Sequence, residues 1–311
     1  MLPVAGRRRS TAARMMGGGG VYLSLGLFGN AIVSGLLLGG FYAAVTIGIS
    51  ISFGMLDIAN IAHPGFIVLG SYGAWYANSR FGVDPLIASV VLMPAFYLLG
   101  AGIYQLYYHA FERRGDASLR GLAFFFGLLF ITEVGLILVF GVDYRLVRAP
   151  YIGPSLYLGA LEFPLRLLVP FLASLAMVGL LWLYLSRSFT GRAILAVAQD
   201  AEALRIMGAN PQRIKRIAFA LSIATTSLAG AILIVIQPVE PSIGRDYIGR
   251  VFAIAVLGGL GSFAGTVVAA ILLGIMESLT ATFYGPSWSP AIAFGFLLLA
   301  LAVKPSGMFG R

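Results

Sequence analysis

The stretch IAFALSIATTSLAGAILIVI, residues 217–236, runs through twenty positions without a charged side chain. A helix of about 20 mostly apolar residues crosses the hydrocarbon core of a bilayer. This stretch is therefore predicted to be a transmembrane helix, and the rest of the chain is interpreted around it.

Similar hydrophobic segments occur along most of the sequence. The other charge-free segments are 85–108, 167–186, 251–276 and the shorter 287–303; residues 58–79 also qualify, and 121–142 does so with one interruption, Glu133. Residues 21–56 are too long for one span and too short for two, with Gly39-Gly40 as a candidate break. We predict an all-α, polytopic transmembrane helix bundle of about eight hydrophobic segments, some of them broken. A β-barrel would show short alternating strands instead.

The overall composition agrees with a membrane protein and excludes several classes of function. The chain is 59% hydrophobic and only 11% charged, so lipid must cover much of its surface. It has no cysteine and two histidines, which excludes thiol chemistry and leaves little room for a metal centre. The net charge of +9 is attributed to basic cytoplasmic loops and not to nucleic-acid binding. No cofactor, metal or catalytic group is predicted.

Loop charges predict the orientation. Residues 187–216 carry six basic side chains against Asp200 and Glu202, which places this segment in the cytoplasm. Counting outward from it, residues 110–120 fall inside, and 143–166 and 239–250 fall outside. Residues 1–20 are expected to be a disordered basic extension without a function of its own.

Two interruptions of the apolar pattern occupy comparable places in the two halves. One is 60–65 (NIAHPG), and the other is 258–265 (GGLGSFAG). Paired interruptions of this kind are a pointer to two repeats with a transport pathway at their interface. Small-residue helix packing is the alternative, and the glycines fit it equally well.

The basic segment contains a short amphipathic helix, predicted over Asp200–Met207 and ended by Gly208 and Asn210-Pro211. A rigid helix between two spans is a lever, because a partner that docks on it moves both spans together. A solvated connector is the alternative reading for such a loop.

Specific residues decide between these readings. Glu202-Ala203-Leu204 with Gly208 resembles the EAA-and-glycine signature of ABC importer permeases, with Leu204 in place of the third alanine. From about residue 25 to the end, the chain resembles the branched-chain amino acid ABC transporter permease family. The stretches that carry this resemblance are 35–43, 57–63 with Gly65, 70–72, 191–193, 198–200, Gly208 with Asn210 and Arg213, 255–262, Glu277 and 305–311; the departures are Ile61 and the inserted Pro64.

The resemblance implies a single permease domain over residues 21–311, in a bacterial inner membrane. It implies an assembly with a second permease, two ATP-binding subunits and a periplasmic binding protein. Residues 187–216, here called the coupling loop, would dock on an ATP-binding subunit through Gly191, Arg192, Asp200, Glu202, Ala203, Gly208 and Asn210. The chain lacks the phosphate loop G-x-x-x-x-G-K-[ST], so it is not expected to be an enzyme itself.

The family implies alternating access for small substrates, with branched-chain or other hydrophobic amino acids as the first choice. Urea, short amides or aromatic acids in the same importer class remain open, and an ion-coupled secondary transporter is a further alternative. Candidate pathway residues are Asn30, Asn60, His63, Glu133, Gln237, Gly258, Gly259 and Gly261. For Glu133 a helix–helix hydrogen bond competes with substrate contact, and for His63 a hydrogen bond that braces the backbone does so. Glu277 and Asp57 are expected at the membrane interface.

Overall fold

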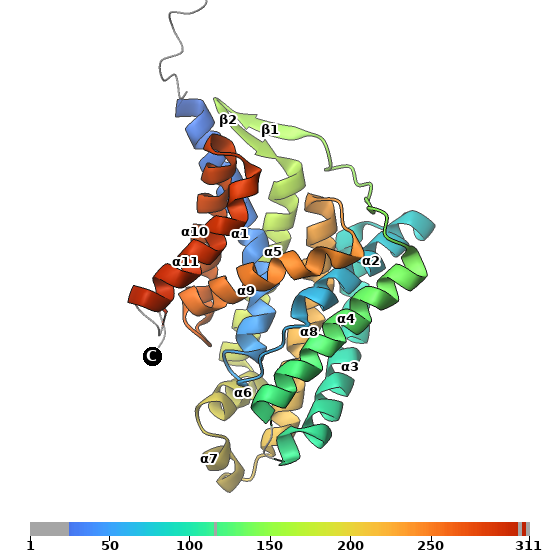
Figure 1. Ribbon diagram of the computed structural model, residues 1–311, viewed down its shortest axis with the longest axis vertical. Helices are drawn as coiled ribbons and strands as arrows, with labels where there is room; N and C mark the ends of the chain where they lie inside the picture. Colours follow the sequence, from blue (N-terminus) through green and yellow to red (C-terminus); the bar gives the residue numbers. More distant parts are fainter. Residues whose placement is uncertain (1–24, 115–116, 304–306, 309–311) are drawn as a thin grey trace, which may run out of the picture.

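Apolar helices form most of the computed structural model, which describes residues 25–114, 117–303 and 307–308 (Figure 1). The longer helices are α1 (Leu25–Ser52), α2 (His63–Phe81), α3 (Pro85–Ala110), α4 (Ala117–Phe140), α5 (Leu165–Arg187), α8 (Pro211–Ile236), α9 (Gly244–Gly258), α10 (Phe263–Phe283) and α11 (Ser289–Val303). Two short helices, α6 (Phe189–Gln199) and α7 (Ala201–Ile206), join α5 to α8, and a β-hairpin of β1 (Ser155–Leu158) and β2 (Leu161–Pro164) precedes α5. The expected extension over 1–20 lies outside the described residues.

Six of these helices are long and apolar enough to cross a membrane: α1, α3, α4, α5, α8 and α10. The predicted all-α transmembrane bundle is thereby confirmed. The two remaining expected segments, 58–79 and 287–303, form α2 and the 15-residue α11, which fall outside the six. The count of eight was therefore approximate.

Two boundaries differ from the sequence prediction, and glycine explains both. Residues 25–52 form one continuous helix with no break at Gly39-Gly40. A Cβ on Gly39 would lie 2.5 Å from the Cα of Ile271, so this glycine permits close contact with α10. Residues 251–276 are not one span, because α9 ends at Gly258 and α10 starts at Phe263. Gly259 and Gly261, with φ of 92° and 80°, make the turn between them.

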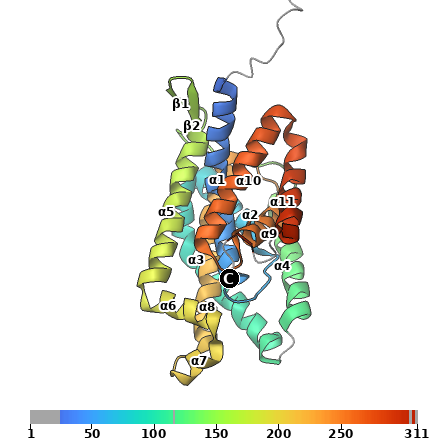
Figure 2. The ribbon, with the colours of Figure 1, turned by 90° about the vertical axis from the view of Figure 1, so that its left-hand side faces the viewer.

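The core of the molecule is built around α8. Of the spanning window of α8, 89% is buried by the protein itself, against 22% for α4 and 28% for α3 and α5. The sequence of α8 explains this position, because its alanines, serines, threonines and Gly230 let neighbouring helices approach closely. Gly230 lies against the backbone of α2 with no room for a Cβ. Figures 1 and 2 show α8 among α1, α2, α3 and α5.

The segment that holds the first predicted interruption, 60–65, also reaches the second, 258–265, through a residue that precedes it, Gly54. The segment between α1 and α2 contacts the turn between α9 and α10, where Gly54 lies directly against the backbone of Gly261. Ser50 of α1 and Thr266 of α10 are hydrogen-bonded at 2.7 Å beside this contact. Each interruption thus joins two helices, and the two helix–break–helix units pack on each other.

The two ends of the bundle are different in character. The β-hairpin and the start of α1 lie together at one end, where the Glu162 amide donates a 2.9 Å hydrogen bond to Asn30. At the opposite end lie α6, α7 and the turn between α3 and α4 (Figure 2). There Lys215 pairs with Glu112 at 2.7 Å, so the two basic loops 110–120 and 187–216 share one end, as their charge predicted.

Candidate functional site

The coupling loop consists of two short helices joined by sharp turns. Ser188 caps α6 by accepting a 2.8 Å hydrogen bond from the Gly191 amide. Asp200 then caps α7, its carboxylate accepting from the amides of Glu202 and Ala203 at 2.9 Å each. Caps of this kind satisfy backbone donors that have no partner within the helix, and they fix where each helix starts. The predicted helix over Asp200–Met207 is present, whereas α6 was not anticipated as a separate helix.

The exit from α7 is fixed by two further residues. Gly208 has φ of 82°, a conformation that residues with a Cβ adopt at a cost. Asn210 accepts a hydrogen bond from the Arg213 amide and caps α8, with Pro211 as its first residue. A chain leaving α5 is thereby turned across the bundle by α6, reversed at α7 and returned into α8 (Figure 2).

The coupling residues divide into packing and exposed groups. Gly191 is buried and lies against the backbone of α5 at Tyr184 and Leu185, so α6 is seated on the end of that span. Arg192, Glu202 and Ala203 are exposed. Ile206 and Met207, at the tip of the loop, are 81% and 73% exposed although they are apolar. The loop therefore presents a charged and apolar surface beyond the helix bundle.

Next to α7 is a polar cleft of about 550 Å³. Its walls come from α7 and its exit, the start of α8 and the end of α3, and they include Glu202, Gly208, Asn210, Lys215 and Glu112. Tyr104 of α3 donates to Glu112 at 2.9 Å, and this links the cleft to the core. The contribution of Glu112, which lies in the 3-10 helix after α3 (Glu112–Arg114), was not recognised in the sequence, because Glu112 and Lys215 are 103 residues apart.

The candidate pathway residues do not form a single group. Asn30 lies at the hairpin end, and Gln237 ends α8, where its side chain donates to Tyr247 of α9 at 2.8 Å. Gly258, Gly259 and Gly261 form the α9–α10 turn and its backbone contacts. Asn60, His63 and Glu133 lie deeper, near the start of α2 and the middle of α4.

His63 is fully buried, and its Nε2 lies 3.2 Å from the carbonyl oxygen of Val45. This is the backbone contact weighed for His63. Within the described chain, His63 Nδ1 and the side chains of Asn60 and Thr46 are buried without a hydrogen-bond partner. Buried polar groups are normally hydrogen-bonded, so these sites favour water or a polar ligand.

Two ion pairs connect the short helix α9 to its neighbours. Arg245 pairs with Glu133 of α4, and Arg250 pairs with Glu277 of α10 at 3.0 Å. Tyr42 of α1 also donates to Glu277. The Glu277 side chain is only 4% exposed, so it is buried among the helices, and the interfacial depth expected for it stays a prediction. Asp57 is exposed, with a positive φ of 55°, in the segment between α1 and α2.

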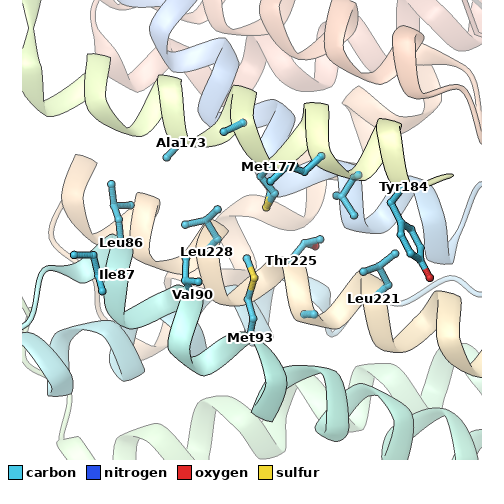
Figure 3. A pocket seen from close by; sticks show the side chains of 14 residues that line it. Leu86, Ile87, Val90, Met93, Ala173, Met177, Tyr184, Leu221, Thr225 and Leu228 are labelled. Atoms are coloured by element: carbon cyan, nitrogen blue, oxygen red, sulfur yellow. The ribbon is translucent and has the colours of Figure 1, made fainter. Parts of the chain in front are cut away.

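A second cavity, the lateral groove, opens on the side of the bundle between α3, α5 and α8. Its volume is about 550 Å³, and leucine, isoleucine, valine, methionine and alanine form nearly all of its lining. Figure 3 shows side chains of α3 and α5 facing each other across it, with Leu221, Thr225 and Leu228 of α8 between them. The groove is therefore a surface for hydrocarbon. Among the described residues, no group of three His, Cys, Asp or Glu side chains could share a metal ion.

Comparisons with known proteins give one consistent result. The sequence model of the family described as branched-chain amino acid transport system / permease component matches residues 31–301. The chain is 29% identical to the high-affinity branched-chain amino acid transport system permease protein BraD of Pseudomonas aeruginosa, over 90% of this chain and 95% of that protein. It is 26% identical to LivH of Escherichia coli K12, over 89% of this chain and 94% of LivH. It is 27% identical to LivM of the same strain, over 86% of this chain and 67% of LivM.

Proposed function

The chain belongs to the branched-chain amino acid transport system permease family, and from this membership we propose that it forms half of the translocation pathway of an ATP-driven importer in a bacterial inner membrane. The chain is a multi-pass membrane protein of the ABC permease type. Its partners in the proposal are a second permease, two ATP-binding subunits and a periplasmic binding protein. Similarity to both LivH and LivM of one strain supports a second, related permease.

The observation that carries the proposal is the form of the coupling loop. It links two spans through a helix, α6, seated on the end of α5, and it presents α7 beyond the bundle beside a polar cleft. In the proposal an ATP-binding subunit docks on Glu202, Ala203 and the apolar tip at Ile206 and Met207. Closure of that subunit moves α6 and α7, and because α6 is seated on the end of α5 and α7 leads directly into α8, the motion passes to α5 and α8.

Branched-chain amino acids are the proposed substrates, delivered from outside by the binding protein. The proposed pathway passes the buried side chains of His63, Asn60 and Thr46, each of which has a polar atom without a hydrogen-bond partner. Alternating access needs such groups near the middle of the membrane, at a junction between broken helices. Asn60 and His63 lie at such a break, between α1 and α2.

A substitution at Gly208 tests the coupling. Gly208→Val should lower ATP-driven uptake of L-leucine about tenfold while ATP hydrolysis by the assembled importer continues, because a β-branched residue at φ of 82° costs about 1–3 kcal/mol and misdirects α7. No atom lies within 4 Å of a Cβ at this position, so the effect is one of backbone conformation only. Uptake and hydrolysis are measured in proteoliposomes that contain the complete importer.

Gly208→Asn is the matched control, because asparagine tolerates a left-handed conformation. It should retain most of the uptake. Glu202→Lys, which reverses an exposed charge on α7, should uncouple in the same way as Gly208→Val. Unchanged uptake in both Gly208→Val and Glu202→Lys would rule out this loop as the place where energy enters.

A further inference from the structure

The two long sides of the bundle differ in their charge. The lateral groove between α3, α5 and α8 has a lining that lipid can cover. The opposite side is formed by α4, α9 and α11, with α9 between the other two (Figures 1 and 2). Here Arg245 and Asp246, neighbours in the first turn of α9, are both exposed. We call the surface of Phe126, Phe130, Glu133, Arg245 and Asp246 the α4/α9 face.

The charges of the α4/α9 face lie at membrane depth. Glu133 is seven residues before the end of α4, which at 1.5 Å per residue places it about 10 Å below that end. A Cβ on Gly244, next to Arg245, would lie 3.3 Å from the carbonyl oxygen of Pro64, so the start of α9 packs on the first turn of α2. An arginine at this depth that faces lipid is costly, and intramembrane charges normally face a water-filled cavity or the protein interior.

The guanidinium of Arg245 uses only part of its hydrogen-bonding capacity. Its Nε donates to Glu133 at 2.8 Å, and Nη2 donates to the second carboxylate oxygen. Nη1 finds no acceptor among the described residues, and the side chain is 53% exposed, whereas that of Glu133 is 6% exposed. An arginine has five N–H donors in a planar fork that suits a carboxylate. Two of these five N–H donors, on the edge of the guanidinium that faces away from Glu133, are available to a ligand.

The second pair on α9 shows what a purely structural arginine looks like in this chain. Arg250 is 15% exposed and donates to Glu277 and to the carbonyl of Asp246. Its partner Glu277 also accepts a hydrogen bond from Tyr42, so the pair is held between α1, α9 and α10. Arg245 lies five residues earlier on the same helix and is left open.

We propose that Arg245 is a specificity-determining residue that binds the carboxylate of the transported amino acid, on an α4/α9 face turned toward a water-filled pathway. The proposal rests on the function proposed above. Glu133 holds one edge of the guanidinium in place and neutralises it between transport cycles. Phe126 and Phe130 lie on the same side of α4 as Glu133, and the Arg245 guanidinium is 5.4 Å from the Phe130 ring centre. They supply an apolar wall for a hydrocarbon side chain.

Thiol labelling tests whether the face is wet. The chain has no cysteine, so Asp246→Cys introduces a single reactive thiol beside an intact Arg245–Glu133 pair. Val90→Cys is the control, because Val90 is exposed in the isolated chain but lies in the lateral groove. In the assembled importer, a charged, membrane-impermeant methanethiosulfonate should label the Asp246→Cys variant but not the Val90→Cys variant. Mass spectrometry of this chain measures the labelled fraction. Absence of label at 246 would overturn the proposal.

A charge swap tests the recognition of the carboxylate. The double variant Glu133→Arg with Arg245→Glu restores an ion pair between α4 and α9 but moves the guanidinium to the other helix. If Arg245 binds the carboxylate, this variant should take up L-leucine about tenfold more slowly or worse, which is the effect expected from losing hydrogen bonds to a charged group. The complete importer should still be recovered with an unchanged Tm. Uptake at the wild-type rate would assign Arg245 a structural role and overturn the inference alone.

Arg245→Lys provides a second variant if the swap fails to assemble. Lysine keeps the charge and one contact to Glu133 but loses the planar fork, so the KM for L-leucine should rise about tenfold with assembly retained. An unchanged KM would overturn the inference. Failure of the wild-type importer itself to take up L-leucine would overturn the proposed function, and it is distinguished because wild type and variants then fail alike.

Discussion

At the scale of single residues, glycines determine how α1 meets α10. A Cβ on Gly35 would lie 2.6 Å from the Cα of Ile275, and one on Gly39 would lie 2.5 Å from that of Ile271. Gly274 on α10 is in turn pressed against the backbone of Gly39. In lipid, helices associate largely through such close packing, because burial of apolar surface gives little extra energy.

Gly39→Ala should destabilise the chain by about 1–3 kcal/mol, because the methyl group forces α1 and α10 apart. Gly127→Ala in α4 is the control: no atom lies within 4 Å of its Cβ, so alanine should be neutral or slightly stabilising there. Thermal unfolding of the two variants in the same detergent measures the difference. Equal Tm values would show that the contact does not constrain α1.

The sequence predicted individual functional residues, but it did not predict their partners in distant parts of the chain. Glu133 was singled out because a carboxylate within an apolar run is costly, and it is indeed buried. Its partner could not be identified, because Arg245 is 112 residues away and lies in a segment that reads as an outer loop. The same limit applies to Glu277, whose burial depends on Arg250 and on Tyr42, 235 residues away.

At the scale of elements, α9 is a short helix that depends on its ion pairs for its position. It has 15 residues, and the Arg250–Glu277 pair joins it to α10 while Tyr42 adds α1. A buried carboxylate that loses its arginine leaves an uncompensated charge, which costs about 3–5 kcal/mol.

Arg250→Met should therefore strongly destabilise the chain, whereas the double variant Arg250→Met with Glu277→Gln should recover much of the loss. The glutamine carries no charge and still offers Tyr42 an acceptor. Unfolding free energies of the two variants and of Glu277→Gln form a double-mutant cycle. Additive losses, with no recovery in the double variant, would contradict the assignment of this pair to the anchoring of α9.

Elements whose ends are set by adjacent residues were predictable, and the others were not. The helix after Asp200 and its end at Gly208 follow from a cap and a glycine only a few residues away. The continuity of α1 through Gly39-Gly40 depends on contact with α10, a distant part of the chain. The interruption at 258–265 was recognised in the sequence, but its glycines could equally have packed a straight helix, so the separation of α9 from α10 did not follow from them.

At the scale of the whole molecule, the bundle has three distinct surfaces. The coupling loop forms one end, the lateral groove is an apolar side, and the α4/α9 face carries charge at membrane depth. This division suits a subunit that is incomplete alone, with lipid on one side, a second permease across a pathway on the other, and an ATP-binding subunit below. The pattern of helices does not identify these partners. They were inferred from the sequence motifs that resemble the permease family.

In the proposed function, this chain moves its substrate only as part of an ATP-driven assembly. The most direct measurement is uptake of radiolabelled L-leucine into proteoliposomes that contain the chain alone, or the chain with its second permease, ATP-binding subunits and binding protein. Uptake is expected only with the full set of subunits and with ATP supplied on the side of the membrane that carries the ATP-binding subunits. No uptake is expected with the chain alone under a proton or sodium gradient. Gradient-driven uptake by the chain alone would contradict it.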